Sequence, residues 1–159
     1  IKTFATLSPI PGFRAWLKNT LGQVRQAPEH ASEVELLAHL DKADWLHGGE
    51  QAEHIRKALQ PYAAYYLLHA KQDREAADAV ARFHLGNGAR VERLNWLADT
   101  SRRGLHQSAG MMVNYLYRLD EVEQNHEMYV REQKVAASRE LRRLAAECPL
   151  AHAKQHQQA

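Results

Sequence analysis

Residues 2–12 read KTFATLSPIPG, a short apolar run that leads directly into a Pro-Ile-Pro-Gly segment. The run is rich in β-branched and aromatic side chains, which favour strands, and the prolines and glycine that follow end a strand. Because Ser8 precedes a proline, its backbone is held extended, and the turn after it is stiff. The sequence therefore predicts a strand over residues 2–8, with the hydroxyl of Ser8 well fixed at the carboxyl end.

Helical and strand patterns both follow this turn. Apolar residues recur at helical spacing from Phe13 to Val24, and Ser32 with Glu35 matches the capping box that begins a short helix. The later segments are predicted to be a helical segment over 55–67 that Pro61 kinks or divides, a helix over Arg74–Leu85, a strand over Ala89–Ala98, a polar connection at Arg102–Gly104, a strand over Met111–Leu119 and a long amphipathic helix over Val122–Cys148. This mixture predicts one helix-rich α/β or α+β domain over residues 1–150, with about three strands.

The composition is typical of one globular domain. The 159 residues are 45% hydrophobic and carry a formal net charge of +2, which gives no strong attraction to nucleic acid or to an anionic membrane. No apolar run approaches the ~20 residues that span a bilayer, and Cys148 is the only cysteine, so no disulfide forms within the chain. We expect a cytoplasmic protein that binds neither nucleic acid nor membrane, with a disordered tail over residues 151–159.

Several common catalytic signatures do not occur in the sequence. It contains no HExxH, CxxC, GxGxxG, Walker or GxSxG motif, so the usual zinc, nucleotide-binding and hydrolase classes have no support. His152 and His156 are four residues apart, but this spacing is weak evidence for a metal site when no third ligand lies nearby. The sequence therefore predicts no metal site, and Cys148 is interpreted as a small buried hydrophobe.

Taken alone, the polar residues near the predicted strands have ordinary explanations. The hydroxyl of Ser8 suits a hydrogen bond within its own turn, and His84 suits the last turn of a helix, where the helix dipole favours it. Tyr115 and Tyr117 are two residues apart in a predicted strand, so they share one face and are typical of a core or an interface. Composition and spacing leave the function open.

Three stretches together are similar to one family. They are FATLSPIPGFRAWL at residues 4–17, VARFHLGNGARVERLNWLADTS at 80–101 and RGLHQSAGMMVNYLY at 103–117. In this order and with these gaps they resemble the C-terminal catalytic domain of malonyl-CoA decarboxylases, which convert malonyl-CoA to acetyl-CoA and carbon dioxide without a metal or organic cofactor. The resemblance implies the C-terminal part of a GNAT-like acyl-CoA fold, a homo-oligomer, and a helical domain with a CoA-gripping segment upstream of residue 1.

The resemblance also implies which residues act. The family's catalytic serine in the SPIPGF motif falls on Ser8, and its histidine in the FHLxNG motif falls on His84. Tyr117 matches an active-site tyrosine, and Asn114 precedes it as a second candidate for substrate binding. We expect Ser8 to orient the departing carboxylate and His84 to protonate the enolate carbon, a step that positioned acids accelerate by about 10²–10⁴-fold. At the variable position of FHLxNG this chain has Gly86, where relatives commonly carry Gln.

Two functions of other classes stay open at this point. One is a GNAT-like acyl-CoA transferase or binding module, which passes an acyl group to an amine or alcohol acceptor. The other is a non-catalytic interaction module built on the apolar stripe Lys134–Cys148 of the predicted C-terminal helix. Product analysis separates the first from decarboxylation. Partner binding that survives Ser8→Ala and His84→Ala would favour the second.

Overall fold

The computed structural model describes residues 2–23, 35, 38–42, 45–46 and 49–152 of the chain. Its main sheet is antiparallel, with the strand order β1-β5-β4, and consists of β1 (Thr3–Pro9), β5 (Met112–Arg118) and β4 (Arg90–Asn95). A smaller pair joins β2 (Lys71–Gln72) to β3 (Glu75–Ala76). The helices are α1 (Phe13–Gln23), α3 (Gly49–His69), α4 (Ala79–Gly86), α5 (Arg102–Ser108), α6 (Val122–Glu132) and α7 (Arg139–Glu147). The predicted helix-rich α+β class is confirmed.

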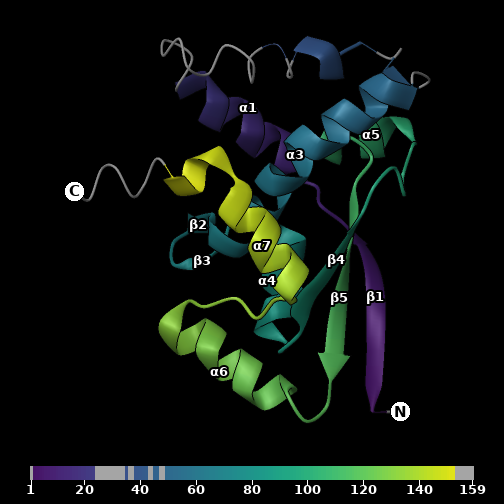
Figure 1. The fold of residues 1–159 in the computed structure, drawn as a ribbon. Coiled ribbons are helices and arrows are strands. Elements are labelled where there is room, and N and C mark those ends of the chain that lie inside the picture. Colours follow the sequence, from purple (N-terminus) through teal and green to yellow (C-terminus); the bar gives the residue numbers. More distant parts are fainter. Residues whose placement is uncertain (1, 24–34, 36–37, 43–44, 47–48, 153–159) are drawn as a thin grey trace.

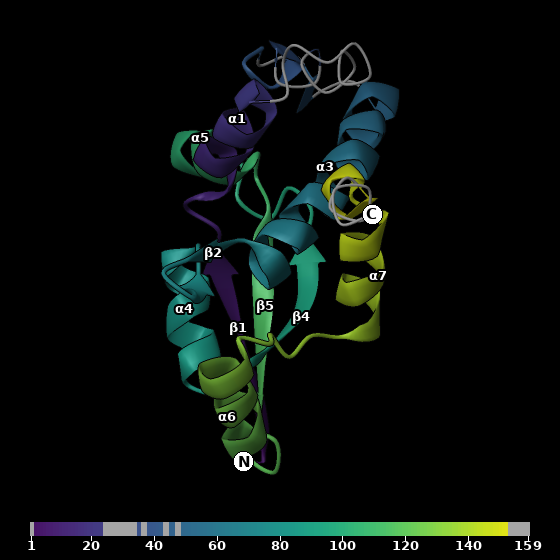
Figure 2. The same cartoon turned by 90° about the vertical axis from the view of Figure 1, so that its left-hand side faces the viewer.

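Helices α4, α6 and α7 lie on one side of the main sheet, as two perpendicular views show (Figure 1, Figure 2). Successive side chains of a strand point to opposite faces. The register pairs Ser8 with Val113 and Thr6 with Tyr115, so these four residues share the helix-covered face, on which Val113 and Tyr115 are fully buried. On the opposite face of β1, Leu7 is 56% exposed.

The hydrophobic core lies between the sheet and the helices, and α3 contributes many of its side chains. Helix α7 packs against α3 and buries Leu141 and Ala145. Fully burying a leucine contributes about 1.5–3 kcal/mol to folding. Cys148 ends this stripe and is fully buried, as predicted, and burial raises the pKa of its thiol to about 11. Cys148 therefore acts as a packing residue.

The predicted helix over Arg74–Leu85 is wrong at its start. Asp73 and Arg74 have φ values of 51° and 73°, and they form the two-residue turn between β2 and β3. Positive φ at both central residues is typical of a type I′ hairpin turn, whose twist matches that of the two strands it joins. Residues with positive φ do not fit a right-handed helix. Helix α4 begins only after Asp78, whose carboxylate accepts hydrogen bonds from two backbone amides of the first turn.

The predicted long helix over Val122–Cys148 is wrong in its middle. Helix α6 ends before Gln133, which has a left-handed φ of 55°, and α7 begins after Ser138. Residues 134–138 run beside β4 instead, where the backbone N–H and carbonyl of Val91 both hydrogen-bond to this segment. These bonds satisfy backbone groups at the edge of β4 that a continuous helix would leave unpaired.

The same division removes the continuous helical stripe Lys134–Cys148 on which an interaction module would depend. The part of the stripe that is helical is not exposed, because Leu141, Ala145 and Cys148 are buried. The C-terminal helix therefore uses its apolar face for the protein's own core.

The prediction at residues 102–104 is wrong, and the structure excludes one of the two outcomes predicted at Pro61. The sequence predicts a polar connection at residues 102–104, but these residues begin α5, and the hydroxyl of Ser101 caps that helix by accepting from the N–H of Gly104. Helix α3 continues through Pro61 as one helix, and no second helix begins there. Helix α5 was missed because its seven residues are too few to show clear apolar periodicity.

Part of the predicted N-terminal and C-terminal structure lies outside the described residues. This applies to Ser32 and most of the short helix predicted after it, and to the tail from residue 153, which includes His156. Residues 151–152 are helical where disorder is predicted. Within the described ranges, no helix combines the length and the apolar character needed to cross a membrane.

Candidate active site

Ser8 and His84 meet across the interface between β1 and α4. The Oγ atom of Ser8 lies 3.2 Å from Nε2 of His84, and both side chains are buried. The same Oγ atom lies 3.1 Å from the hydroxyl oxygen of Thr6, two residues earlier on the same face of β1. The serine hydroxyl can therefore accept one hydrogen bond and donate another.

The imidazole of His84 is held on its second nitrogen and on one face as well. Its Nδ1 atom lies 2.6 Å from the hydroxyl oxygen of Tyr117. The ring of Tyr115 stacks on the imidazole with a centroid distance of 4.4 Å, and Phe4 stacks on Tyr117 at 4.7 Å. Tyr115 and Tyr117 share one face of β5, as their spacing predicts. These contacts leave the imidazole little rotational freedom.

Burial determines the protonation of this group of residues. It lowers the pKa of His84, because desolvation disfavours the imidazolium form, so the ring is neutral at pH 7. It raises the pKa of Tyr117, so the phenol keeps its proton. A neutral imidazole carries one N–H and one acceptor nitrogen. When Tyr117 donates to Nδ1, the N–H therefore sits on Nε2, facing Ser8.

Asn114 lies on the opposite face of β5 from these tyrosines. Its amide nitrogen donates to the backbone carbonyl of Thr6 at 2.9 Å, and its amide oxygen accepts from Asn95 at 2.8 Å. The amide thus links the three strands of the sheet, and the structure does not bring it together with His84 and Tyr117. Its predicted contact with substrate stays a prediction.

Asp78 is a buried residue of this region that the sequence analysis missed. It is 1% exposed, and its carboxylate links the turn after β1 to the first turn of α4. A sequence signal does exist, because an aspartate directly before an apolar periodic run is a typical helix N-cap. The incorrect helix start at Arg74 hid that signal.

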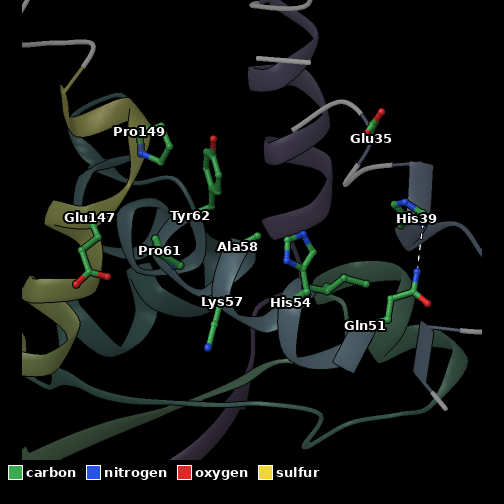
Figure 3. A pocket seen from close by; sticks show the side chains of 11 residues that line it. Glu35, His39, Gln51, His54, Lys57, Ala58, Pro61, Tyr62, Glu147 and Pro149 are labelled. Carbon is green, nitrogen blue, oxygen red and sulfur yellow. Dashed lines mark hydrogen bonds between the residues drawn. The ribbon is translucent and has the colours of Figure 1, made fainter. Parts of the chain in front are cut away.

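A separate cavity of about 410 Å³ lies along α3. Figure 3 shows the side chains that line it. Its wall includes His54 and Lys57 of α3 and Glu147 of α7, but no member of the hydrogen-bonded group Ser8, His84 and Tyr117. Nothing in the described part of the chain groups three or more His, Cys, Asp or Glu side chains as metal ligands. We therefore place the candidate active site at Ser8, His84 and Tyr117, where two hydroxyl groups lie within hydrogen-bond distance of an imidazole that can accept or donate a proton.

Comparison with known sequences identifies relatives of this chain. The sequence profile described as the malonyl-CoA decarboxylase C-terminal domain matches residues 1–158. The mitochondrial malonyl-CoA decarboxylase of Rattus norvegicus is 34% identical in an alignment 165 residues long. This alignment covers 91% of this chain and 33% of that protein. The mitochondrial malonyl-CoA decarboxylase of Anser anser anser is 32% identical over 159 residues, which cover 89% of this chain and 32% of that protein.

Comparison with solved structures agrees with the sequence relatives. The crystal structure of malonyl-CoA decarboxylase from Rhodopseudomonas palustris has a TM-score of 0.83 at 43% identity, and the match covers 90% of this chain and 33% of that chain. The enzyme from Agrobacterium vitis has a TM-score of 0.83 at 41% identity, with 91% and 36% covered. This chain therefore spans about a third of the length of these relatives. It belongs to the malonyl-CoA decarboxylase family and matches the C-terminal domain of that family.

Proposed function

We propose that this chain carries the decarboxylating site of a malonyl-CoA decarboxylase, which converts malonyl-CoA to acetyl-CoA and carbon dioxide. One observation carries the proposal, namely the hydrogen-bonded series from Ser8 through His84 to Tyr117 in a member of this family. The names of the relatives support the same reaction. In this proposal Ser8 and His84 are the catalytic residues, and Tyr117 holds the imidazole.

Decarboxylation places two demands on such a site. The bond between the carboxylate carbon and the α-carbon breaks, and its electron pair moves into the thioester enolate. The site must therefore hold the carboxylate out of the plane of the thioester carbonyl and stabilise the negative charge that develops on its oxygen. The hydroxyl of Ser8, held between Thr6 and His84, suits the first task by donating a hydrogen bond to the carboxylate.

His84 supplies the proton that completes the reaction. With the imidazole N–H on Nε2, the proton lies beside Ser8 and therefore beside the carboxylate that leaves. It passes from Nε2 to the α-carbon and forms the new C–H bond of the acetyl group. Nδ1 takes the proton of Tyr117 at the same time, so the imidazole stays neutral and Tyr117 is left as a phenolate. A proton from solvent returns to the phenolate oxygen after the product leaves, which completes the uptake of one proton per turnover.

The direct test measures acetyl-CoA formed from malonyl-CoA by this chain and, in parallel, by a polypeptide that includes any natural upstream sequence. We expect His84→Ala to lower kcat by about 10²–10⁴-fold, the usual contribution of a positioned acid, with little change in KM. Ser8→Ala should also lower kcat. His106→Ala is the matched control, because His106 is exposed on α5 and should keep the rate. An undiminished rate in His84→Ala would exclude the proposed role.

The products separate decarboxylation from acyl transfer. Decarboxylation gives equal amounts of acetyl-CoA and carbon dioxide with no acceptor present. A transferase instead places the acyl group on an added amine or alcohol and releases no carbon dioxide. That second outcome would replace the proposal with an acyl-CoA transferase.

A further inference from the structure

Asp78 joins the turn after β1 to the first turn of α4. One carboxylate oxygen accepts from the N–H of Gly12 at 3.2 Å and from the hydroxyl of Tyr66 at 3.3 Å. The other accepts from the N–H of Val80 at 3.1 Å and from that of Ala81 at 3.0 Å. All four donors are neutral, and both oxygens are used. The carboxylate is therefore a link between two segments that are far apart in the sequence.

These two segments carry the reacting side chains. Ser8 directly precedes the Pro-Ile-Pro-Gly turn, and His84 follows Asp78 by six residues, or about 9 Å along α4 at ~1.5 Å per residue. A group that fixes the turn to the start of α4 therefore also fixes the distance between Ser8 and His84. We propose that Asp78 is a positioning residue, which holds the hydroxyl of Ser8 against the imidazole of His84.

Gly12 indicates that the turn is built for this contact. A Cβ atom at Gly12 would collide with the hydroxyl of Tyr66 and would lie 3.5 Å from the carboxylate of Asp78. Tyr66 is 2% exposed and packs between Phe13 and Trp16, so its ring cannot move aside cheaply. Only glycine lets the backbone of the turn lie this close to the hydroxyl of Tyr66, which itself donates to Asp78.

The charge of Asp78 also reaches the residue that stacks on His84. Burial raises the pKa of Tyr115, and the negative charge of Asp78 raises it further. Tyr115, whose ring stacks on the imidazole, therefore keeps its proton beside His84.

Asparagine at position 78 tests the link with little change of shape. It turns one acceptor oxygen into an NH₂ donor, which must face either the two amides of α4 or the N–H of Gly12, and none of these can accept. Keeping the remaining oxygen on the two amides of α4 satisfies more donors. Asp78→Asn is therefore expected to keep the helix cap and release the turn that follows Ser8.

Ser138→Ala is the matched control for this substitution. It removes the hydroxyl that caps α7 by accepting from the N–H of Leu141, so it also weakens a helix start, but in a helix that does not carry the site. We expect Asp78→Asn to lower kcat by about 10- to 100-fold and to leave KM within about twofold, because misplacement affects the chemical step. Ser138→Ala should lower the thermal midpoint and keep kcat.

The inference rests on the proposed function, so a second readout is independent of activity. Nitrogen-15 NMR of labelled histidine gives the pKa of His84, identified by the signal missing in His84→Gln. Burial lowers this pKa, so a loosened site should return it toward the ordinary value of ~6.5 in Asp78→Asn but not in Ser138→Ala. The titratable groups against the ring, Tyr115 and Tyr117, keep their protons in this range.

The outcomes are distinguishable. Unchanged kcat and unchanged His84 pKa in a folded Asp78→Asn protein would overturn the inference. A wild-type protein without decarboxylase activity would overturn the proposed function, and the His84 pKa would then decide the inference alone. If Asp78→Asn does not fold, Tyr66→Phe decides, because it removes one donor and leaves the helix cap intact. A smaller pKa shift in the same direction supports the positioning role, and no shift overturns it.

Discussion

The imidazole of His84 is the side chain on which the candidate site depends. Its two nitrogens lie within hydrogen-bond distance of Ser8 and Tyr117, and its ring is buried. Because burial lowers the pKa of His84, the folded protein binds this proton less readily than the unfolded chain, whose histidine pKa is ~6.5. The stability that depends on the neutral ring is therefore present above pH ~6.5 and is lost as the pH falls toward the folded-state pKa.

The lowered pKa of His84 predicts how the stability of the protein depends on pH. We expect the free energy of unfolding of the wild type to fall between pH ~7.5 and pH ~5.5 more steeply than that of His84→Gln, which has no titrating ring at this position. Urea unfolding at the two pH values measures the difference. Identical slopes for the two proteins would mean that His84 titrates alike in the folded and unfolded states.

The two tyrosines of β5 allow a paired substitution. Tyr117→Phe keeps the ring stacked on Phe4 but removes the hydroxyl at Nδ1 of His84. We expect kcat to fall by more than the roughly 3- to 10-fold of a lost hydrogen bond of about 0.5–1.5 kcal/mol, because the phenol also supplies the proton that Nδ1 takes in the proposed reaction. The hydroxyl of Tyr115 is buried and has no hydrogen-bond partner within the described residues. Tyr115→Phe should therefore keep both activity and stability. Equal losses of kcat in the two variants would contradict this assignment.

At the scale of elements, the two glycines at the end of α4 differ in their effect on how this helix joins α6. Gly88 has a φ of +88°, and a Cβ atom there would collide with the backbone carbonyl of Val122 at the start of α6. The side chain of Asn125 donates to the carbonyl of Gly88 at 3.1 Å. A Cβ atom at Gly86 would meet nothing within 4 Å. Only the second glycine of this segment is therefore required by packing.

Alanine at each glycine tests this difference. We expect Gly88→Ala to cost about 1–3 kcal/mol of stability, from the positive φ and the collision. Gly86→Ala should be neutral or stabilising by up to about 1 kcal/mol, because alanine is the better helix former. Denaturant unfolding of both variants gives the comparison. A loss in Gly86→Ala as large as that in Gly88→Ala would show that the steric account is wrong.

Elements with strong local patterns could be predicted from the sequence. The strand before the Pro-Ile-Pro-Gly turn, the helix after it and the strand over 112–118 appear where residue type, helical spacing or alternation indicates them. The strand over 90–95 fits neither period, and its position between glycines indicates it. Predictions failed where contacts distant in sequence decide the structure. Residues 134–138 follow the hydrogen bonds of Val91, and the turn at Asp73 and Arg74 contains no glycine that would reveal its positive φ.

The candidate site shows the same limit. Ser8, His84 and Tyr117 have ordinary explanations when taken one at a time, and only the resemblance to a family selects them. Asp78 was not predicted as a site residue, because its role depends on Gly12 and Tyr66, which lie 66 and 12 residues away in the chain. The local signal of Asp78 marks only a helix N-cap, and its contacts with Gly12 and Tyr66 leave no local signature.

At the scale of the whole molecule, the main sheet has one helix-covered face and one exposed face. β1 is the outer strand of the order β1-β5-β4. Its Leu7, on the exposed face, is 56% exposed, and its Phe4, on the helix-covered face, is 50% exposed. Outer strands with exposed apolar side chains are templates for association with other chains. The described residues therefore present an adhesive surface at β1.

We expect the isolated chain to self-associate with increasing concentration. Leu7→Lys puts a charge on the exposed face of β1, away from the face that carries Ser8, and should lower this association. Val130→Lys is the matched control, since Val130 is 57% exposed on α6 and far from the sheet edge. Sedimentation velocity measures both variants. Equal effects of the two substitutions would mean that β1 is not the adhesive surface.

The pairing of β1 with β5 also affects the order in which the site assembles during synthesis. About a hundred residues separate the two strands, so at ~5–20 residues per second β1 waits about 5–20 s for its partner to leave the ribosome. Helices and hairpins form in microseconds. His84 on α4 can therefore be in place before β5 brings Tyr117. Ser8 reaches its position last, when β1, the first of the three described strands to be synthesised, pairs with β5.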